Sequence, residues 1–158
     1  MNQKKSVKFL FAPLFILFLA LFASCGEKGS SLNDGYYTAE AAEFDEHGWK
    51  EYVTICVSGG QIIFIEYNAF NPSGFIKSWD MDYMRVMNAT DGTYPNFYAR
   101  SYGRQFLEHQ GTDGVDAISG ATHSYHTFLT LADTVLKNAR EGNADTALVH
   151  FNADRAEL

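Results

Sequence analysis

The sequence predicts an α+β domain, in which a small antiparallel sheet packs with about three helices. Segments that alternate apolar and polar residues come first along the chain, and segments with helical periodicity follow them. That order is typical of α+β folds rather than of a parallel sheet with crossover helices. About 125 residues remain after the N-terminal leader and its tether, enough for one domain with its own core.

The strands are expected mainly in the N-terminal half of the domain. The first follows the turn pair Asp34-Gly35, and the second and third are joined by a hairpin at Ser58-Gly59-Gly60. The third strand is apolar on both faces, which predicts a central position with packing on each side. In chain order, the expected strands cover residues 36–44, 50–57, 61–69 and 147–151.

Three helices are expected in the C-terminal half. The first contains Tyr83, Met84 and Met87, with Ser78 or Asp80 as its cap and an end at Asp91-Gly92. The second covers residues 94–108, and its candidate core residues are Phe97, Ala99, Tyr102, Phe106 and Leu107. The third covers residues 124–140 before Gly142, and its apolar stripe consists of Phe128, Leu131, Ala132, Val135, Leu136 and Ala139.

The first 24 residues have the pattern of a secretory signal. Three lysines precede an apolar run that is shorter than the roughly 20 residues needed to span a bilayer. The segment Phe22-Ala23-Ser24-Cys25 resembles a bacterial lipobox, which implies that Cys25 carries lipid. A plain signal peptide followed by an ordinary exported cysteine is the alternative. We therefore expect a lipoprotein signal peptide over residues 1–24, a flexible tether over 25–33 and a folded domain over 34–158.

Charge and cysteine content narrow the possible partners. Removal of residues 1–24 takes away three lysines and leaves nine basic and nineteen acidic side chains, a net charge of −10. Nucleic acid is not a partner for so acidic a surface, and contact with the membrane is expected through the lipid alone. With Cys25 lipidated, Cys56 has no cysteine to pair with, and its place in an alternating strand predicts a buried structural thiol.

The most specific motif is Asp116-Ala117-Ile118-Ser119-Gly120-Ala121-Thr122, which directly precedes the third helix. Helix N-termini have unsatisfied N–H groups and partial positive charge, so a phosphate bound there needs no arginine. Gly120 permits close approach of the backbone to a bulky group, and the Thr122 hydroxyl is the part that must react. The alternative is that the threonine is an ordinary helix cap.

This motif resembles the attachment sequence of flavin-binding domains that carry FMN covalently on threonine. The resemblance extends over nearly the whole mature chain, to FMN-binding lipoproteins of bacterial surfaces, some of which act in extracellular electron transfer, and to flavin-carrying subunits of membrane reductases. It implies FMN bound to Thr122 by a phosphoester and installed by a separate flavin transferase that uses FAD and a divalent metal. The other matching segments begin at Asp34, His47, Ser58, Lys77 and Tyr94.

The resemblance and the residue types together give a set of candidate cofactor-binding residues. Tyr83, Trp79 and Tyr94 are candidates for stacking on the flavin ring, or else for filling the core. Lys77 and Asp80 could hydrogen-bond the ring edge or the phosphate, or form a solvated pair at a helix start. The full set is Thr122, Asp116, Ser119, Gly120, Ala121, His123, Lys77, Ser78, Asp80, Tyr83 and Tyr94.

No nucleophile–base constellation is found, and no metal site is expected, because His123 and His126 lack a carboxylate or thiol at matching spacing. The sequence thus predicts an exported, lipid-anchored flavoprotein on the extracytoplasmic face of a membrane. It would relay electrons between membrane or extracellular redox partners without catalytic turnover of its own. A lipoprotein that binds or scavenges FMN noncovalently is one alternative. A surface scaffold in which the motif only caps a helix is another.

Overall fold

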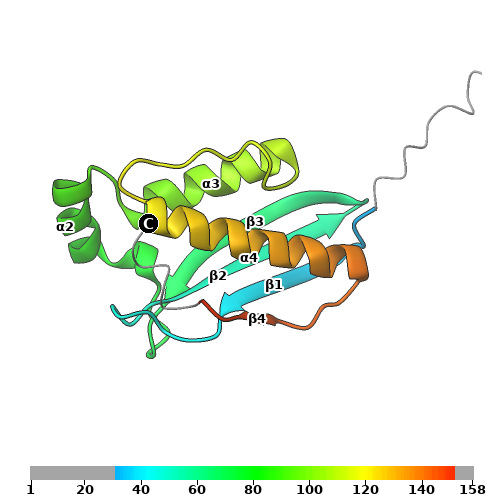
Figure 1. Ribbon diagram of the computed structural model, residues 1–158, viewed down its shortest axis with the longest axis horizontal. Helices are drawn as coiled ribbons and strands as arrows, with labels where there is room; N and C mark the ends of the chain where they lie inside the picture. The colour runs from blue at the N-terminus through cyan, green and yellow to red at the C-terminus, as the bar shows by residue number, and fades with distance from the viewer. Residues whose placement is uncertain (1–30, 152–158) are drawn as a thin grey trace, which may run out of the picture. The chain divides into compact units, whose positions relative to one another are not determined.

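The structure, a computed structural model, describes residues 31–151 as a sheet with two long helices on one face (Figure 1). The expected α+β fold is confirmed. The predicted signal peptide, the lipidated Cys25 and the rest of the tether up to residue 30 lie outside the described residues, as do residues 152–158. The elements are β1 (Gly35–Ala41), β2 (Lys50–Ser58), β3 (Gln61–Phe70), the 3₁₀ helix η1 (Lys77–Trp79), α2 (Met81–Asp91), α3 (Pro95–His109), α4 (Thr122–Glu141) and β4 (Ala147–Val149).

The strands are ordered β3-β2-β1-β4 across the sheet. The pairs β1–β2 and β2–β3 are antiparallel, as expected, whereas β4 pairs with β1 in parallel because the chain returns to the sheet through α4. The first strand ends at Ala41 rather than at residue 44. A turn follows it, in which the Asp45 carboxylate accepts hydrogen bonds from the N–H groups of His47 and Trp49.

The expectation that the third strand is central is wrong, because β3 lies at the edge of the described sheet, with β2 as its one neighbouring strand there. Its apolar second face has a local cause. The register shifts between the pairs Cys56–Phe64 and Val57–Ile62, so Ile63 lies in a bulge and is 60% exposed. Cys56 is buried on β2 as expected.

The core lies between the sheet and helices α3 and α4. All six residues of the predicted α4 stripe are buried, and the Phe128 ring packs 5.4 Å from that of Tyr102. On α3 the prediction is wrong for Phe97, which is 48% exposed on the outer side of the helix. Gly103 has a packing role, because a Cβ there would lie 3.2 Å from a methyl group of Ile65, so the glycine lets α3 approach β3 closely.

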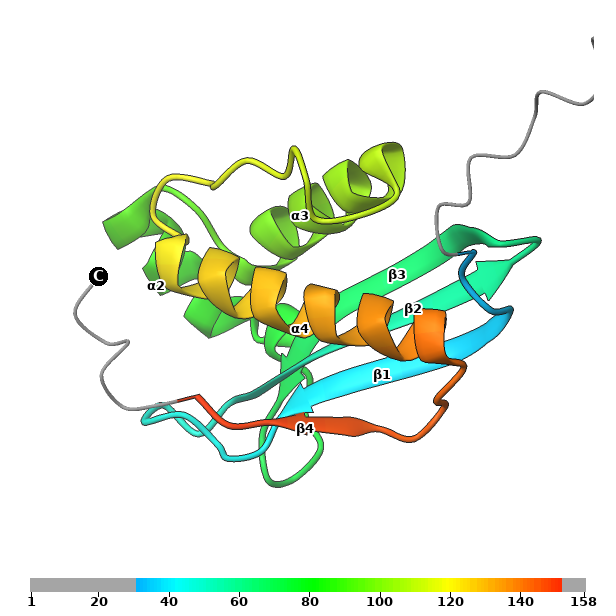
Figure 2. The same ribbon diagram turned by 45° about the vertical axis from the view of Figure 1, so that its right-hand side comes forward.

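Helix α2 packs differently from the other two. None of its eleven residues is buried. Asp80 is its N-cap and accepts a hydrogen bond of 2.9 Å from the N–H of Tyr83, which confirms one of the two predicted caps. Figures 1 and 2 show α2 at the end of the domain where α4 begins, beside the predicted attachment motif.

Candidate functional site

Thr122 is the first residue of α4, and its side chain is exposed. The N-cap position belongs to Ala121, so the alternative in which Thr122 caps the helix is not the arrangement found. Within the described residues no side chain caps this end, and the first turn has no acidic residue. The start of a 20-residue helix therefore presents backbone N–H groups and a free hydroxyl together.

The loop before α4 is held by α3. The Tyr102 hydroxyl accepts a hydrogen bond from the N–H of Ile118 and donates one to the carbonyl of Ala121, each at 3.2 Å. The N–H of Asp116 donates to the side-chain oxygen of Gln105 at 2.8 Å. The side chains of Asp116 and Ser119 remain exposed on this loop. The motif is therefore a loop that hydrogen bonds tie to α3, with the side chains of Asp116 and Ser119 exposed.

Gly120 is required by the protein's own backbone. Its φ is 79°, in the left-handed region, and a Cβ there would overlap the carbonyl oxygen of Asp91 at the end of α2. The sequence analysis assigned the missing side chain to the approach of a bulky ligand. In the structure the close neighbour is α2, so this glycine fixes the loop against that helix.

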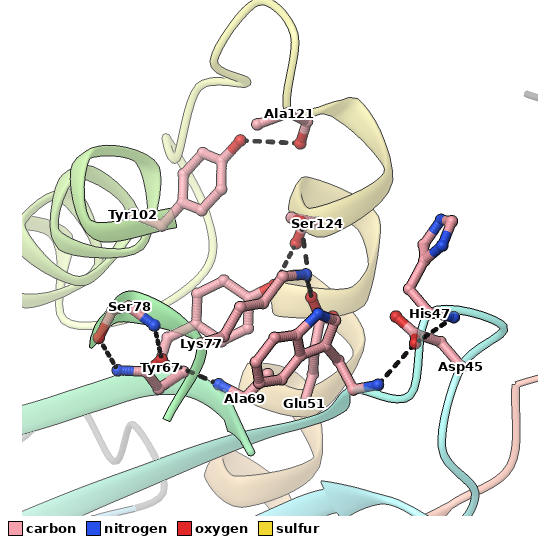
Figure 3. A network of polar contacts seen from close by, with 12 residues as sticks. Asp45, His47, Glu51, Tyr67, Ala69, Lys77, Ser78, Tyr102, Ala121 and Ser124 are labelled. Carbon is pink, nitrogen blue, oxygen red and sulfur yellow. Dashed lines mark hydrogen bonds and ion pairs between the residues drawn. The ribbon is translucent and has the colours of Figure 1, made fainter. Parts of the chain in front are cut away.

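A buried polar cluster lies below the first turn of α4 (Figure 3). It consists of Glu51 on β2, Tyr67 on β3, Lys77 on η1 and Ser124 on α4, and we call it the Glu51 cluster. The Glu51 carboxylate lies 4.0 Å from the Lys77 ammonium and 3.5 Å from the Ser124 hydroxyl. Tyr67 donates a hydrogen bond of 2.9 Å to the Ser124 carbonyl. Glu51 is only 8% exposed and Lys77 only 6%.

Burial dominates the electrostatics of this cluster. Loss of hydration raises the pKa of the Glu51 carboxyl, and the positive charges of Lys77 and then His123 oppose that rise. Burial also raises the pKa of the Tyr67 and Tyr98 hydroxyls, and the nearby Glu51 charge adds to both shifts. The two tyrosines therefore act as neutral hydrogen-bonding groups, and Glu51 holds its proton more tightly than an exposed glutamate does.

Aromatic rings surround the Lys77 ammonium. Its nitrogen lies 5.4 Å from the ring centroid of Tyr83 and 5.9 Å from that of Trp49, within the range of cation–π attraction. A cavity of about 10 Å³ borders Lys77 and Glu51, enough for about one water molecule. Lys77 and Tyr83, two predicted site residues from the same matching segment, thus lie close together beside the Glu51 cluster.

Of the other predicted residues, Ser78 and Asp80 support η1 and α2, whereas Tyr94 lies on the surface of α3. Asp80 caps α2, and the Ser78 hydroxyl accepts a hydrogen bond of 2.8 Å from the Asn68 amide, so both hold η1 and α2 in place. Tyr94 packs against Phe97 at 5.9 Å and lines a shallow groove along α3 with Arg100. The partners found for Tyr94 therefore place it on the surface of α3 rather than in the Glu51 cluster.

Sequence reasoning missed Glu51, although a signal was present. Glu51 precedes Val53 and Ile55 at spacings of two, so it shares a strand face with two apolar residues, both of which are fully buried. A charged residue on a buried strand face is rare and needs partners. The sequence pattern could have identified the residue, but its partners come from three other elements.

Two further findings concern the part of the chain that the structure describes. Among residues 31–151, no three His, Cys, Asp or Glu side chains lie close enough to hold a metal ion. None of the helices in that range has the length and apolar character that a membrane crossing requires.

Two known proteins are similar to most of this chain. The 15 kDa lipoprotein of Treponema pallidum (strain Nichols) is 35% identical over 119 residues, which are 75% of this chain and 84% of that protein. The chain belongs to the family of this lipoprotein. The crystal structure of CPE2226 protein from Clostridium perfringens is similar to the structure of this chain, with a TM-score of 0.73 and 40% sequence identity. The match covers 77% of this chain and 99% of that one. No family model matches the chain.

Proposed function

We propose that this protein is an exported, lipid-anchored flavoprotein that carries FMN on Thr122 and relays electrons between membrane or extracellular redox partners. The observation that carries the proposal is the position of Thr122, exposed at the first residue of a helix whose end lacks a side-chain cap. A hydroxyl in that position can form a phosphoester while the neighbouring N–H groups stabilise the phosphate charge.

The proposed lipid anchor is supported by the similar treponemal protein and by the sequence. The treponemal protein is named a lipoprotein, and this chain has a lipobox-like segment that ends in Cys25. Lipid on Cys25 would hold the domain at the extracytoplasmic face of a membrane through a tether of a few residues. A cofactor that dissociates outside the cell is lost, so covalent attachment has a clear use there.

The residues around Thr122 fit FMN. The first turn of α4 has no acidic side chain to repel a phosphate. Tyr83 is half-buried beside Lys77, and Trp79 is 66% exposed on the adjoining η1, so aromatic faces are available to a flat ring. When bound, the flavin supplies the redox chemistry, and the chain supplies position and electrostatics.

Attachment requires another enzyme. The described neighbours of Thr122 include no carboxylate in the first turn of α4, so the hydroxyl has no evident base to activate it. The loop nevertheless exposes Asp116 and Ser119, and α4 exposes His123 next to Thr122, which gives a second protein a polar surface to recognise. We therefore propose an FAD-using flavin transferase as the partner in maturation.

The test is co-expression with such a transferase, followed by denaturing electrophoresis and mass spectrometry. We expect flavin fluorescence that survives denaturation, a mass increase equal to attached FMN, and complete loss of both in Thr122→Ala. Thr90→Ala, an exposed threonine at the end of α2, is the matched control and should keep the flavin.

Each other outcome has a distinct meaning. Flavin that leaves on denaturation would support the noncovalent FMN-binding alternative, and flavin retained in Thr122→Ala would refute the attachment site. A protein that acquires no flavin in any preparation would refute both the covalent and the noncovalent FMN hypotheses and favour a surface scaffold.

A further inference from the structure

The tether enters the domain at the end that carries the β2–β3 hairpin. The Asp34 carboxylate accepts hydrogen bonds of 2.9 Å from the N–H groups of Gly59 and Gly60, in the turn of that hairpin. The Asn33 amide donates a hydrogen bond of 3.0 Å to the carbonyl of Arg140, in the last turn of α4. Figure 2 shows the start of β1 beside both of these elements. The place where the chain enters the fold is therefore fixed by hydrogen bonds to two elements.

Exposed apolar side chains gather at the same end, on the sheet face that points away from α3 and α4. Tyr37 belongs to the core, so the alternation of β1 directs Tyr36 to the opposite face. Tyr36 pairs with Cys56, which pairs with Phe64 on β3, so these three form one row across that face. Tyr36 is 68% exposed and Phe64 47%, and Ile63 in the adjoining bulge is 60% exposed. We call Tyr36, Ile63 and Phe64 the outer apolar patch.

A lipid on Cys25 would keep this patch close to a membrane. Cys25 precedes Ser31, the first described residue, by six positions, so even a fully extended chain spans only about 20 Å between them. Tyr36 follows Asp34 by two residues and therefore lies next to the tether exit. The patch is thus the exposed apolar surface that an anchored domain brings nearest to the lipid.

We propose that the outer apolar patch rests on the lipid surface once Cys25 is anchored, so that side chains of the domain bind the membrane together with the lipid. This inference rests on the lipid anchor of the proposed function and not on FMN. The sequence analysis expected membrane contact through the lipid alone. Tyrosine favours the boundary between headgroups and acyl chains, and apolar side chains buried there gain from leaving water.

The charges beside the tether exit agree with this contact, although the mature chain has a net charge of −10. Arg140 is exposed on the helix side of the exit, beside Glu141, and can donate to a lipid phosphate. On the sheet side, both carboxylate oxygens of Asp34 already accept hydrogen bonds from the hairpin turn. Arg140 and the outer apolar patch would therefore flank the anchor on its two sides.

The resulting orientation presents the predicted attachment site to partners. Helix α4 has 20 residues and is about 30 Å long, with Arg140 beside the tether exit and Thr122 at its other end. With the patch on the lipid, Thr122 and α2 lie at the end of the domain that is remote from the membrane (Figures 1 and 2). A transferase or redox partner then reaches the motif from the aqueous side.

The test is tryptophan fluorescence of the lipidated full chain in phosphatidylcholine vesicles that contain a lipid with a doxyl quencher near its headgroup. Phe64→Trp places the probe in the patch. Leu148→Trp is the matched control, because Leu148 is 59% exposed on the same sheet face but pairs with Glu40, four residues beyond Tyr36 on β1. After subtraction of the signal from the two native tryptophans, we expect quenching of Phe64→Trp to be about twice that of Leu148→Trp.

Two further substitutions separate side-chain contact from nearness caused by the short tether. Tyr36→Ser and Ile63→Ser, introduced together into the Phe64→Trp variant, remove apolar groups and leave the tether unchanged. We expect them to reduce the quenching of that variant by about half, because contact of the patch holds the domain at the lipid. Both positions are more than half exposed, so the fold should tolerate the changes, which circular dichroism checks.

The outcomes distinguish this inference from the function on which it rests. If mass spectrometry shows lipid on Cys25 and the two tryptophan variants are quenched equally, the membrane contact is refuted while the anchor stands. Quenching that the two serines leave unchanged also refutes it. Emission of the Phe64→Trp variant that shifts with protein concentration and not with vesicles would place a second copy on the patch instead. A chain that carries no lipid refutes the anchor and the inference together, whereas attachment of FMN has its own test.

Discussion

The two ends of α4 bury their side chains equally well but contain different chemistry. From Leu131 to Ala139 the buried positions are mostly apolar, and they pack against the apolar part of the sheet. At the N-terminal end the buried positions are Ser124 and Thr127, and β2 places Glu51 against them. The same strand and the same helix thus form an apolar contact at one end and a charged contact at the other.

This difference indicates that the polar, N-terminal end of α4 is not optimised for stability alone. Apolar residues at the polar end would avoid the cost of removing Glu51 and Lys77 from water, and such replacements in other proteins are often neutral or stabilising. A buried carboxyl with a raised pKa beside a buried ammonium is more frequent at functional sites. Ser124, at the polar end, follows Thr122 by two residues in the first turn of α4.

The largest effect is expected from Phe128→Ala, in the apolar stripe of α4 where it meets the polar end. Phe128 is fully buried, and its ring contacts those of Tyr67, Tyr102 and Phe106. We expect the free energy of unfolding to fall by about 4 kcal/mol, measured by urea denaturation. The loss should be the same at pH 5 and pH 7, because the substitution removes no charge. Leu129→Ala, at a partly buried neighbour, is the control and should cost less.

At the polar end, Lys77→Met should cost about 3 kcal/mol at pH 7, because it leaves Glu51 buried without its cation. The cost should depend on pH. Removal of the Lys77 charge raises the pKa of Glu51 further, so more of the variant's carboxyl is neutral at pH 5 than at pH 7 and the loss of stability is smaller at pH 5. Urea denaturation at the two pH values measures it, with Glu51→Gln/Lys77→Met as the control that removes both charges.

The direction follows from proton binding. Glu51 has an ordinary pKa of 4.5, and folding raises it, so the folded state binds this proton more tightly than the unfolded chain does. The stabilisation from this group is complete below pH 4.5 and is lost as pH rises through the folded pKa. In Lys77→Met the folded pKa of Glu51 is higher still, so this stabilisation is lost at a higher pH than in the unaltered protein. A cost that is equal at pH 5 and pH 7 would contradict the pairing of Lys77 with Glu51.

The contrast between the two ends also explains how much the sequence could reveal. All six predicted residues of the α4 stripe are buried, because a 3.6-residue period indicates which side of a helix faces the core, although Asn138 is buried in the same range and was not predicted. The edge position of β3 was missed, because the bulge at Ile63 makes an edge strand look apolar on both faces. The parallel pairing of β4 depends on the path of the chain through α4, which no local pattern records.

The candidate site was predictable only in its local part. The motif correctly located Thr122 at the start of a helix, because Gly-Ala-Thr before an apolar period is a local signal. The meeting of Glu51, Lys77 and Ser124 joins β2, η1 and α4, segments far apart in the sequence. Gly120 was identified as important for a different reason, since its neighbour Asp91 lies on a helix about thirty residues earlier.

The smallest of the three effects concerns the contact that holds the polar end to α2. In Gly120→Ala the new Cβ overlaps the Asp91 carbonyl, and the alanine must adopt a positive φ. The loop must therefore move, and we expect the free energy of unfolding to fall by about 2 kcal/mol. Gly92→Ala is the matched control, because its φ of 71° is similar but no atom lies within 4 Å of the added Cβ. In Gly92→Ala the free energy of unfolding should fall by about 1 kcal/mol, because the alanine must adopt a positive φ without meeting any clash. Urea denaturation of both variants isolates the clash, and equal losses would mean that the loop before α4 is not fixed by α2.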